Sequence, residues 1–171
     1  MTSIDIPNSV TSMGNGVFFA CSSLNSVTLP DGITSIGDSS FSSCDVLITV
    51  DIPNSVTSIG NRAFYGCDYI TSIDIPNSVN SIGNEVFRAC SNLNKVTIGN
   101  SIKSIGERAF SYCWALKTVY CYATTPPTCG NYAFEDPSMT GATLYVPLRC
   151  GTKYKISRDW EYYFKNIKEM E

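Results

Sequence analysis

The chain repeats itself with a period of 23 residues. The stretch "DIPNSVTSIGNRAFYGC", residues 51–67, returns one period later as "DIPNSVNSIGNEVFRAC", residues 74–90. Five columns of like residues keep this spacing: Ile4, Val27, Val50, Ile73, Val96 and Val119; Phe18, Phe41, Phe64, Phe87 and Phe110; Gly14, Gly37, Gly60, Gly83 and Gly106; Leu24, Leu47, Ile70, Leu93 and Leu116; and Cys21, Cys44, Cys67, Cys90 and Cys113. A unit of this length cannot bury its own apolar face, so the repeats must stack on one another.

Each repeat predicts one strand and a return. "LNSVTLP", residues 24–30, alternates apolar and polar residues, as a strand with one buried face does. A second short alternating stretch, residues 55–60, ends at a glycine that needs either a positive φ or a close approach to a neighbour. We expect "NRAFYGC", residues 61–67, to return through a short helical or 3₁₀ turn. The pattern predicts a β-rich solenoid: one parallel sheet, with one strand per 23-residue coil and short helical or 3₁₀ returns.

The repeat motifs resemble a known family. L-x-x-L-x-L fits residues 24–29 and 93–98, and the remainder, "IPxxVxSIGxxxFxxCxxL", is similar to the BspA-like leucine-rich repeats. The resemblance implies a right-handed leucine-rich-repeat solenoid in a single domain, residues 1–171. Five regular repeats would occupy 1–118, and an atypical last repeat and C-terminal cap 119–171. Members with assigned roles are mostly adhesins on bacterial surfaces, so a cell-surface or secreted location is implied. An asparagine ladder is not to be assumed where the classical repeat has Asn, because serine or glycine stands there: Ser9, Gly32, Ser55, Ser78 and Ser101.

The composition argues against several classes of function. The net charge of −3 disfavours nucleic acid, which needs clustered Lys and Arg. No apolar run approaches the ~20 residues of a membrane span, and "MTSIDIPNSV" has no signal-peptide pattern. The absence of histidine removes Ser-His-Asp and Cys-His catalysis and every His-based metal site. No catalytic residue, metal or cofactor is therefore predicted.

The cysteines are expected to be structural. The five in the repeating column should point inward as small apolar groups, and Cys121 falls in an inward strand position and should join them. Cys129 and Cys150, both in the cap, are the only plausible disulfide pair. Zinc is disfavoured because the chain has no C-x-x-C motif.

Two surfaces are candidates for binding. The outward strand positions should line the sheet face and end in tyrosines: Asp5, Thr28, Asp51, Asp74, Thr97, Tyr120 and the neighbouring Tyr122. A second set of aromatic residues lies in the returns: Phe19, Tyr65, Tyr69, Tyr112 and Trp114. The alternatives are that the face is merely solvated and that the aromatic residues pack against adjacent returns.

Charged residues also repeat. Asp51 and Asp74 occupy one outward position in adjacent coils, near the ~5–5.5 Å spacing of a retaining glycosidase pair. They would lie on an open sheet with no cleft, so solvated turn residues are the plainer interpretation, and calcium would need more oxygen ligands. Arg62, Glu85 and Arg108 are 23 apart and predict a ladder of alternating charge.

The two ends differ in their expected packing. Trp160, Phe164 and Ile167 follow helical spacing and predict a lid on the last coil. The first coil has no such cover, so we expect either that the chain is the C-terminal piece of a longer array or that it self-associates through its first strand edge.

We therefore predict a non-catalytic protein-binding module, an adhesin or part of one, whose partner is a host or bacterial surface protein. A spacer with no ligand of its own is the alternative, and a carbohydrate-active enzyme the distant third.

Overall fold

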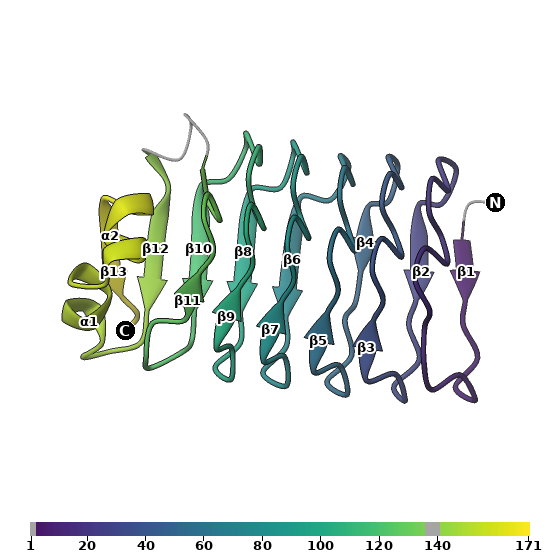
Figure 1. Ribbon diagram of the computed structural model, residues 1–171, viewed down its shortest axis with the longest axis horizontal. Coiled ribbons are helices and arrows are strands. Elements are labelled where there is room, and N and C mark those ends of the chain that lie inside the picture. The colour runs from purple at the N-terminus through teal and green to yellow at the C-terminus, as the bar shows by residue number, and fades with distance from the viewer. Residues whose placement is uncertain (1–2, 136–140) are drawn as a thin grey trace.

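The coils stack along one axis in chain order. The computed structural model describes residues 3–135 and 141–171, and Figure 1 shows the stack running from the N-terminal coil to a helical cap. One strand of each coil lies in a parallel ladder: β1 (Ser3–Asp5), β2 (Ser26–Thr28), β4 (Thr49–Val50), β6 (Ser72–Ile75), β8 (Lys95–Ile98), β10 (Thr118–Cys121) and β12 (Thr143–Val146). The ladder is interrupted between β4 and β6, which lie next to each other without strand pairing. The predicted parallel solenoid is confirmed.

A second ladder makes the coil different from the one predicted. The stretch before each repeated glycine also pairs in parallel with its copies: β3 (Ser35–Ile36), β5 (Ser58–Ile59), β7 (Ser81–Ile82), β9 (Ser104–Ile105) and β11 (Thr128–Cys129). Each isoleucine points inward and is buried, as Ile59 and Ile82 show at 2% exposure. The prediction of a single strand per coil is therefore wrong, since the second alternating stretch pairs too.

The returns are tight turns and not helices. Within one return the amide of Tyr65 donates to the carbonyl of Arg62 at 3.1 Å, but the amide of Phe64 donates to Val86 in the next coil at 2.9 Å. Alternate amides reach across because two residues in each return have a positive φ, such as Arg62 at 55° and Gly66 at 67°. The left-handed residues interrupt any helix. The expected helical or 3₁₀ turn is wrong for this reason, although its i→i+3 bonds are present.

Like side chains lie over like side chains in the core. The rings of Phe18, Phe41, Phe64, Phe87, Phe110 and Phe134 stack in one file, with centroids 4.9–5.3 Å apart. Phe134 keeps its place although it comes one residue late in the sequence. Such offset ring contacts contribute about 0.5–1.5 kcal/mol each beyond their burial. The stacking that the repeat predicts is confirmed.

Four of the five cysteines in the repeating column are buried and hydrogen-bonded, and Cys21 in the first coil is partly buried. The thiol of Cys67 donates to the carbonyl of Phe41 at 3.1 Å, and those of Cys44, Cys90 and Cys113 make the equivalent bond. Burial raises the pKa of Cys44 to about 11 and that of Cys67 and Cys90 well above the usual value. Cys121 is buried as expected. Cys129 and Cys150 are separate thiols rather than a disulfide.

The repeated glycines are required by close approach. A Cβ on Gly83 would lie 2.8 Å from the amide nitrogen of Asn61, and one on Gly106 would lie 2.4 Å from the carbonyl oxygen of Gly83. Neither residue has a positive φ. Of the two predicted reasons for these glycines, a positive φ or a close approach, the structure therefore shows the close approach between coils.

The residue after each glycine carries a polar ladder. The side-chain oxygen of Asn61 accepts the amide of Asn84 at 2.8 Å, and Asp38 does the same for Asn61 at 2.7 Å. The ladder extends in both directions, from Asn15 to Glu107. It satisfies backbone amides that the second ladder leaves unpaired. This ladder was not predicted from the sequence, because its residues lie away from the classical asparagine position.

The cap closes the last coil. Helices α1 (Gly151–Lys155) and α2 (Arg158–Tyr163) precede β13 (Asn166–Glu169), which pairs with β12. Trp160 is fully buried and donates its indole N–H to the carbonyl of Pro127 at 2.8 Å, and Phe164 packs edge-on against Phe134 at 5.0 Å. The predicted lid is confirmed for these two residues. The helical position of Ile167 is wrong, because the backbone becomes extended at Phe164 and continues as a strand.

Candidate binding surface on the sheet face

We call the outward side of the first ladder the sheet face. Its main column is the predicted set of residues, Asp5 to Tyr120, extended by Tyr145 and Lys168. Strand pairing places Asp5 beside Thr28, Asp74 beside Thr97, and Tyr120 between Thr97 and Tyr145. The alternation in β6 shows why: Ile73 and Ile75 are buried and Asp74 is exposed. The structure therefore brings the predicted column together on one surface.

The C-terminal part of the sheet face is aromatic. Tyr120 and Tyr145 stack with ring centroids 4.9 Å apart and planes 19° apart. The ammonium of Lys95 lies 5.5 Å from the centroid of Tyr120, within the range of a cation–π contact. Tyr122 is 45% exposed beside them. Tyr145 was not among the predicted residues, although Leu144 follows Val119 as the next member of its column and so places Tyr145 level with Tyr120.

The N-terminal part of the sheet face carries acidic and small side chains. Asp5, Asp51 and Asp74 are exposed, and the hydroxyl of Thr28 donates to Asp5 at 2.6 Å. Neither Asp51 nor Asp74 lines the grooves at the cap, at the returns or at the first coil. Among residues 3–135 and 141–171, no three acidic or sulfur side chains cluster as metal ligands. The two aspartates thus lie on an open surface.

The aromatic residues of the returns form one local cluster. The guanidinium of Arg88 lies 5.8 Å from the ring of Tyr65 and 5.2 Å from that of Tyr112, whose ring lies 5.6 Å from Trp114. Tyr112 and Trp114 are about half exposed, and so are the more distant Phe19 and Tyr69. Tyr65 and Tyr112 pack against Arg88 and Trp114 packs against Tyr112, whereas among the described residues Phe19 and Tyr69 take no part in these contacts. The predicted aromatic set is thus only partly brought together.

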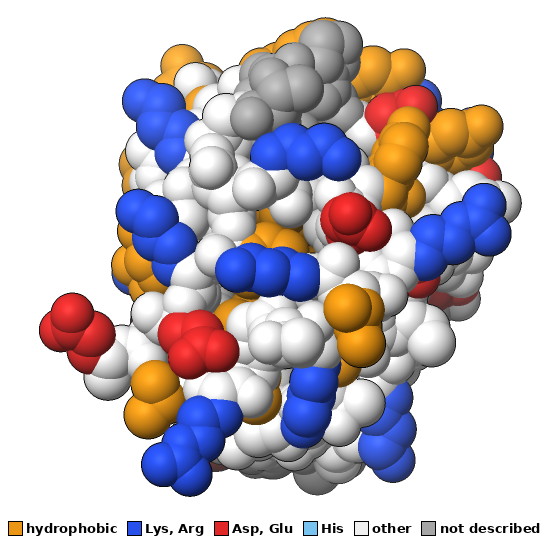
Figure 2. Space-filling view, turned by 90° about the vertical axis from the view of Figure 1, so that its left-hand side faces the viewer, with side chains coloured by type: hydrophobic (Ala, Val, Ile, Leu, Met, Phe, Trp, Pro, Cys, Tyr) orange, Lys and Arg blue, Asp and Glu red, His pale blue; other side chains and the backbone are white. Residues whose placement is uncertain are grey.

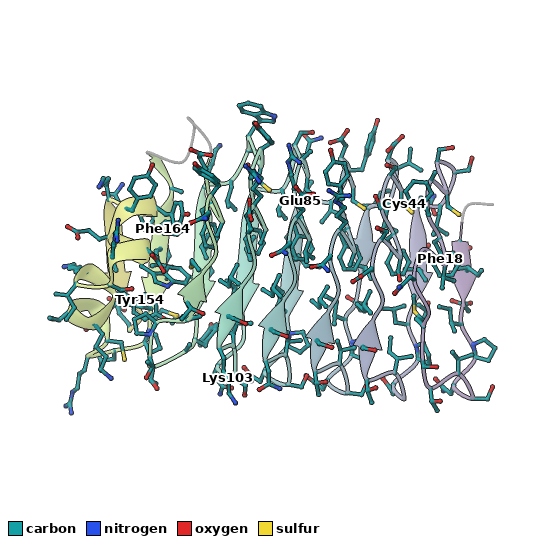
Figure 3. The ribbon with its side chains drawn as sticks, in the orientation of Figure 1. Phe18, Cys44, Glu85, Lys103, Tyr154 and Phe164 are labelled. Atoms are coloured by element: carbon teal, nitrogen blue, oxygen red, sulfur yellow. The ribbon has the colours of Figure 1, made fainter. Side chains whose placement is uncertain are left out.

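The predicted charge ladder is half formed. Arg62 pairs with Glu85 at 2.5 Å, but Glu85 turns to Arg88 at 3.0 Å and Arg108 pairs with Glu107. Burial alone raises the pKa of Glu85, and the hydrogen bond and charge of Arg62, aided by Arg88, outweigh it, so the pKa lies below its usual value. Figure 3 shows Glu85 among the returns, on the side opposite Lys103. The ladder stabilises two adjacent returns only.

Each end of the stack carries a hollow. One groove lies between the last coil and α2 and has a volume of about 580 Å³. The other, about 290 Å³, is on the first coil and is lined by Ile4, Phe18, Cys21 and Leu24 among others. In the described part of the chain β1 pairs with β2 alone, so its other edge is open.

Comparison with sequence families shows to which family the chain belongs. The pattern of the "BspA type Leucine rich repeat region" matches residues 1–117 and 57–148, in six copies. The chain belongs to the BspA-type leucine-rich repeat family. This BspA-type membership covers most of the sequence, including the regular repeats and β12. A comparison with curated proteins finds no match.

Solved structures show the same BspA-type stack. A leucine-rich repeat protein of T. pallidum is 31% identical, with a TM-score of 0.67 over 69% of this chain and 57% of that one. A leucine-rich cell surface protein of Faecalibacterium prausnitzii A2-165 is 32% identical, with a TM-score of 0.74 over 85% and 39%. The pneumococcal vaccine antigen PcpA shares the fold at 19% identity and a TM-score of 0.74, over 100% and 42%.

The BspA-type chain is shorter than these neighbours, spanning 57%, 39% and 42% of their lengths. The Faecalibacterium prausnitzii neighbour is described as a cell surface protein. Across residues 3–135 and 141–171, helices long and apolar enough to traverse a bilayer are absent.

Proposed function

We propose that this chain is a non-catalytic protein-binding module of a bacterial cell surface, an adhesin or part of one, that engages its partner through the sheet face. The observation that carries the proposal is the outward column, whose C-terminal part holds the Tyr120–Tyr145 stack with the ammonium of Lys95 against Tyr120. The cell-surface relative at 32% identity supports the location. The partner is a protein of a host or of another bacterium.

The chemistry of the sheet face favours a protein ligand. Tyrosine is enriched at the centres of protein interfaces, where its ring gives contact area and its hydroxyl a hydrogen bond. The small side chains of the acidic part, such as Thr28 and Asp51, leave the sheet accessible over several coils. A flat, extended surface of this kind fits a folded partner better than a small molecule, which needs a concave site.

The variant Tyr120→Ala with Tyr145→Ala tests the proposal. Both side chains are only partly buried, so the fold should persist while binding falls by about tenfold or more. Binding is measured by biolayer interferometry against purified extracellular-matrix proteins and bacterial surface proteins. Asp51→Lys with Asp74→Lys tests the acidic part in the same way.

Trp114→Ala tests the second candidate surface, the aromatic residues of the returns, and so separates it from the sheet face. It removes an aromatic residue of 53% exposure from the returns instead of the sheet face, so binding should be unchanged. Equal loss in Trp114→Ala and in the tyrosine pair would contradict a role specific to the sheet face. An unaltered chain that binds none of these proteins would favour the spacer, and glycan turnover lost in Asp51→Asn would favour the enzyme.

A further inference from the structure

A groove separates the last coil from the cap. It holds about 580 Å³, within the ~300–1,000 Å³ typical of ligand sites. One wall is the turn after β11, with Asn131 and Tyr132, and the other is the α2 region, with Arg158, Glu161, Tyr162 and Lys165. The groove lies outside the sheet face and shares none of its residues.

The walls of the groove are held in place by one side of α2. Asp159 accepts the amide of Cys129 at 3.3 Å, Trp160 donates to Pro127 at 2.8 Å, and the hydroxyl of Tyr163 accepts the amide of Ala133 at 3.1 Å. These bonds tie the helix to the backbone of the last coil. The groove is thus formed before any ligand arrives, which lowers the entropic cost of binding.

The opposite side of α2 faces the groove with aromatic and basic groups. Tyr162 is 65% exposed and Tyr132, across the groove, 42%. Arg158 and Lys165 form no ion pair within the described residues, whose three ion pairs all lie in the returns. Of the two groove carboxylates, Asp159 is engaged by an amide and Glu161 is exposed. Lys165 donates one hydrogen bond to the carbonyl of Glu161 at 3.2 Å, and the guanidinium of Arg108 lies 5.1 Å from the ring of Tyr132. The groove therefore offers a ligand the guanidinium of Arg158, the remaining N–H groups of Lys165, exposed phenol rings and one carboxylate.

The molecule is electrostatically polarised toward this end. Residues 1–85 hold eight carboxylates and one arginine, whereas residues 86–171 hold eleven Lys and Arg against seven carboxylates. Figure 2 shows basic side chains spread over the cap end. The field of such a distribution draws anions to the cap and away from the first coils.

We propose that this groove binds an acidic oligosaccharide. A carboxylate or sulfate on the sugar would bond to Arg158 and Lys165, since a guanidinium matches the two oxygens of such a group. The apolar face of a sugar ring would pack on Tyr162 or Tyr132, and Asn131 would bond to hydroxyls. The site adds a glycan ligand to the protein partner of the sheet face, and the two can be occupied independently.

Isothermal titration with three probes tests the proposal: a heparin hexasaccharide, hexagalacturonate and maltohexaose. The two acidic probes should bind at least tenfold more tightly than the neutral one and weaken as salt rises. Binding of heparin alone would assign the site to sulfated sugars, and binding of hexagalacturonate alone to uronates, both within the proposal. Equal binding of maltohexaose, or no binding of either acidic probe, would overturn it.

Variants locate the binding. Tyr162→Ala and Arg158→Gln should each weaken the acidic probes about tenfold, and Glu161→Gln should tighten them severalfold by removing a repelling charge. Lys155→Gln, an equally charge-neutralising change on α1 outside the groove, should change affinity less than twofold. If Lys155→Gln weakens binding as much as Arg158→Gln, the attraction is diffuse and the site is wrong. The tyrosine pair variant of the sheet face should bind the probes normally.

Discussion

At the scale of single residues, the fold depends on the absence of a side chain at the repeated glycines. The glycine column lets one coil approach another so closely that any Cβ would meet backbone atoms, as at Gly83 and Gly106. The amide ladder through Asn61 and Asn84 follows directly, because that approach brings each side-chain oxygen to the next amide. The repeated glycine thus accounts both for the close packing of the coils and for the hydrogen bonds of the amide ladder.

Gly83→Ala should destabilise the protein by about 2–3 kcal/mol, the cost of overpacking a contact that cannot relax. The free energy of unfolding is measured by guanidinium titration. Gly14→Ala is the matched control, because no atom lies within 4 Å of the added methyl, and should change stability by no more than about 0.5 kcal/mol. Equal losses in both variants would mean that the backbone conformation of glycine, and not the close contact between coils, accounts for the effect on stability.

The stacking of like residues was largely predictable from the sequence. The phenylalanine and cysteine columns follow from identical residues at one period, since stacked coils place like over like. The amide ladder was harder to predict because its column mixes residue types, Asn15, Asp38, Asn61, Asn84 and Glu107, and only their shared ability to accept a hydrogen bond unites them.

At the scale of elements, the returns show that the local sequence pattern does not determine the backbone conformation. Arg62, Glu85 and Arg108 adopt a positive φ at 50–56° without being glycine, so composition carries no signal of the turns they form. Ile167 fits a helical spacing from Trp160 and Phe164 and still lies in a strand, since β12 offers it an edge to pair with. In both cases contact with the neighbouring coil overrides local preference.

Glu85→Gln should reduce stability by about 1 kcal/mol at pH 7 by removing the pairing with Arg62 and Arg88. The folded-state pKa of Glu85 lies below its ordinary value of 4.5, so its contribution is complete above that value and is lost as the pH falls through the lower, folded-state pKa. The stability difference between the two proteins should therefore shrink in acid. Unfolding titrations at several pH values measure it.

Glu107→Gln serves as the comparison for Glu85→Gln. Its partner, Arg108, is its neighbour in sequence, and both side chains are about 40% exposed, so the loss should be smaller. A difference for Glu85→Gln that stays constant down to pH 3 would show that the pairing is not the source of the effect.

At the scale of the whole molecule, the two ends are unlike. The cap covers the last coil with Trp160 and Phe164, whereas in the described part of the chain β1 leaves one edge unpaired, near a groove lined by Ile4 and Phe18. Open strand edges beside apolar groups favour pairing with another chain. The acidic character of the first coils opposes it at low salt.

We propose that the chain self-associates through this edge. Sedimentation velocity should show a concentration-dependent dimer that strengthens with salt, and Ile4→Lys should abolish it by placing a charge in the contact. Lys168→Gln, on the strand at the other end, should leave it intact. A monomer at all concentrations, with the first coil protected from hydrogen exchange, would contradict the proposal.

The constant 23-residue step has a consequence for how such a chain can change in length. Removing or duplicating one full period anywhere in the regular region would bring together surfaces that already fit, so a gene could grow or shrink in whole units without new compensating substitutions. A shift by 22 or 24 residues would set each ring over a residue adjacent to the next phenylalanine, such as Ser40 or Ser42, and each glycine over a larger residue, such as Ile82 or Asn84. The late arrival of Phe134 shows where one such shift is tolerated: beside the cap, where only one further layer has to match.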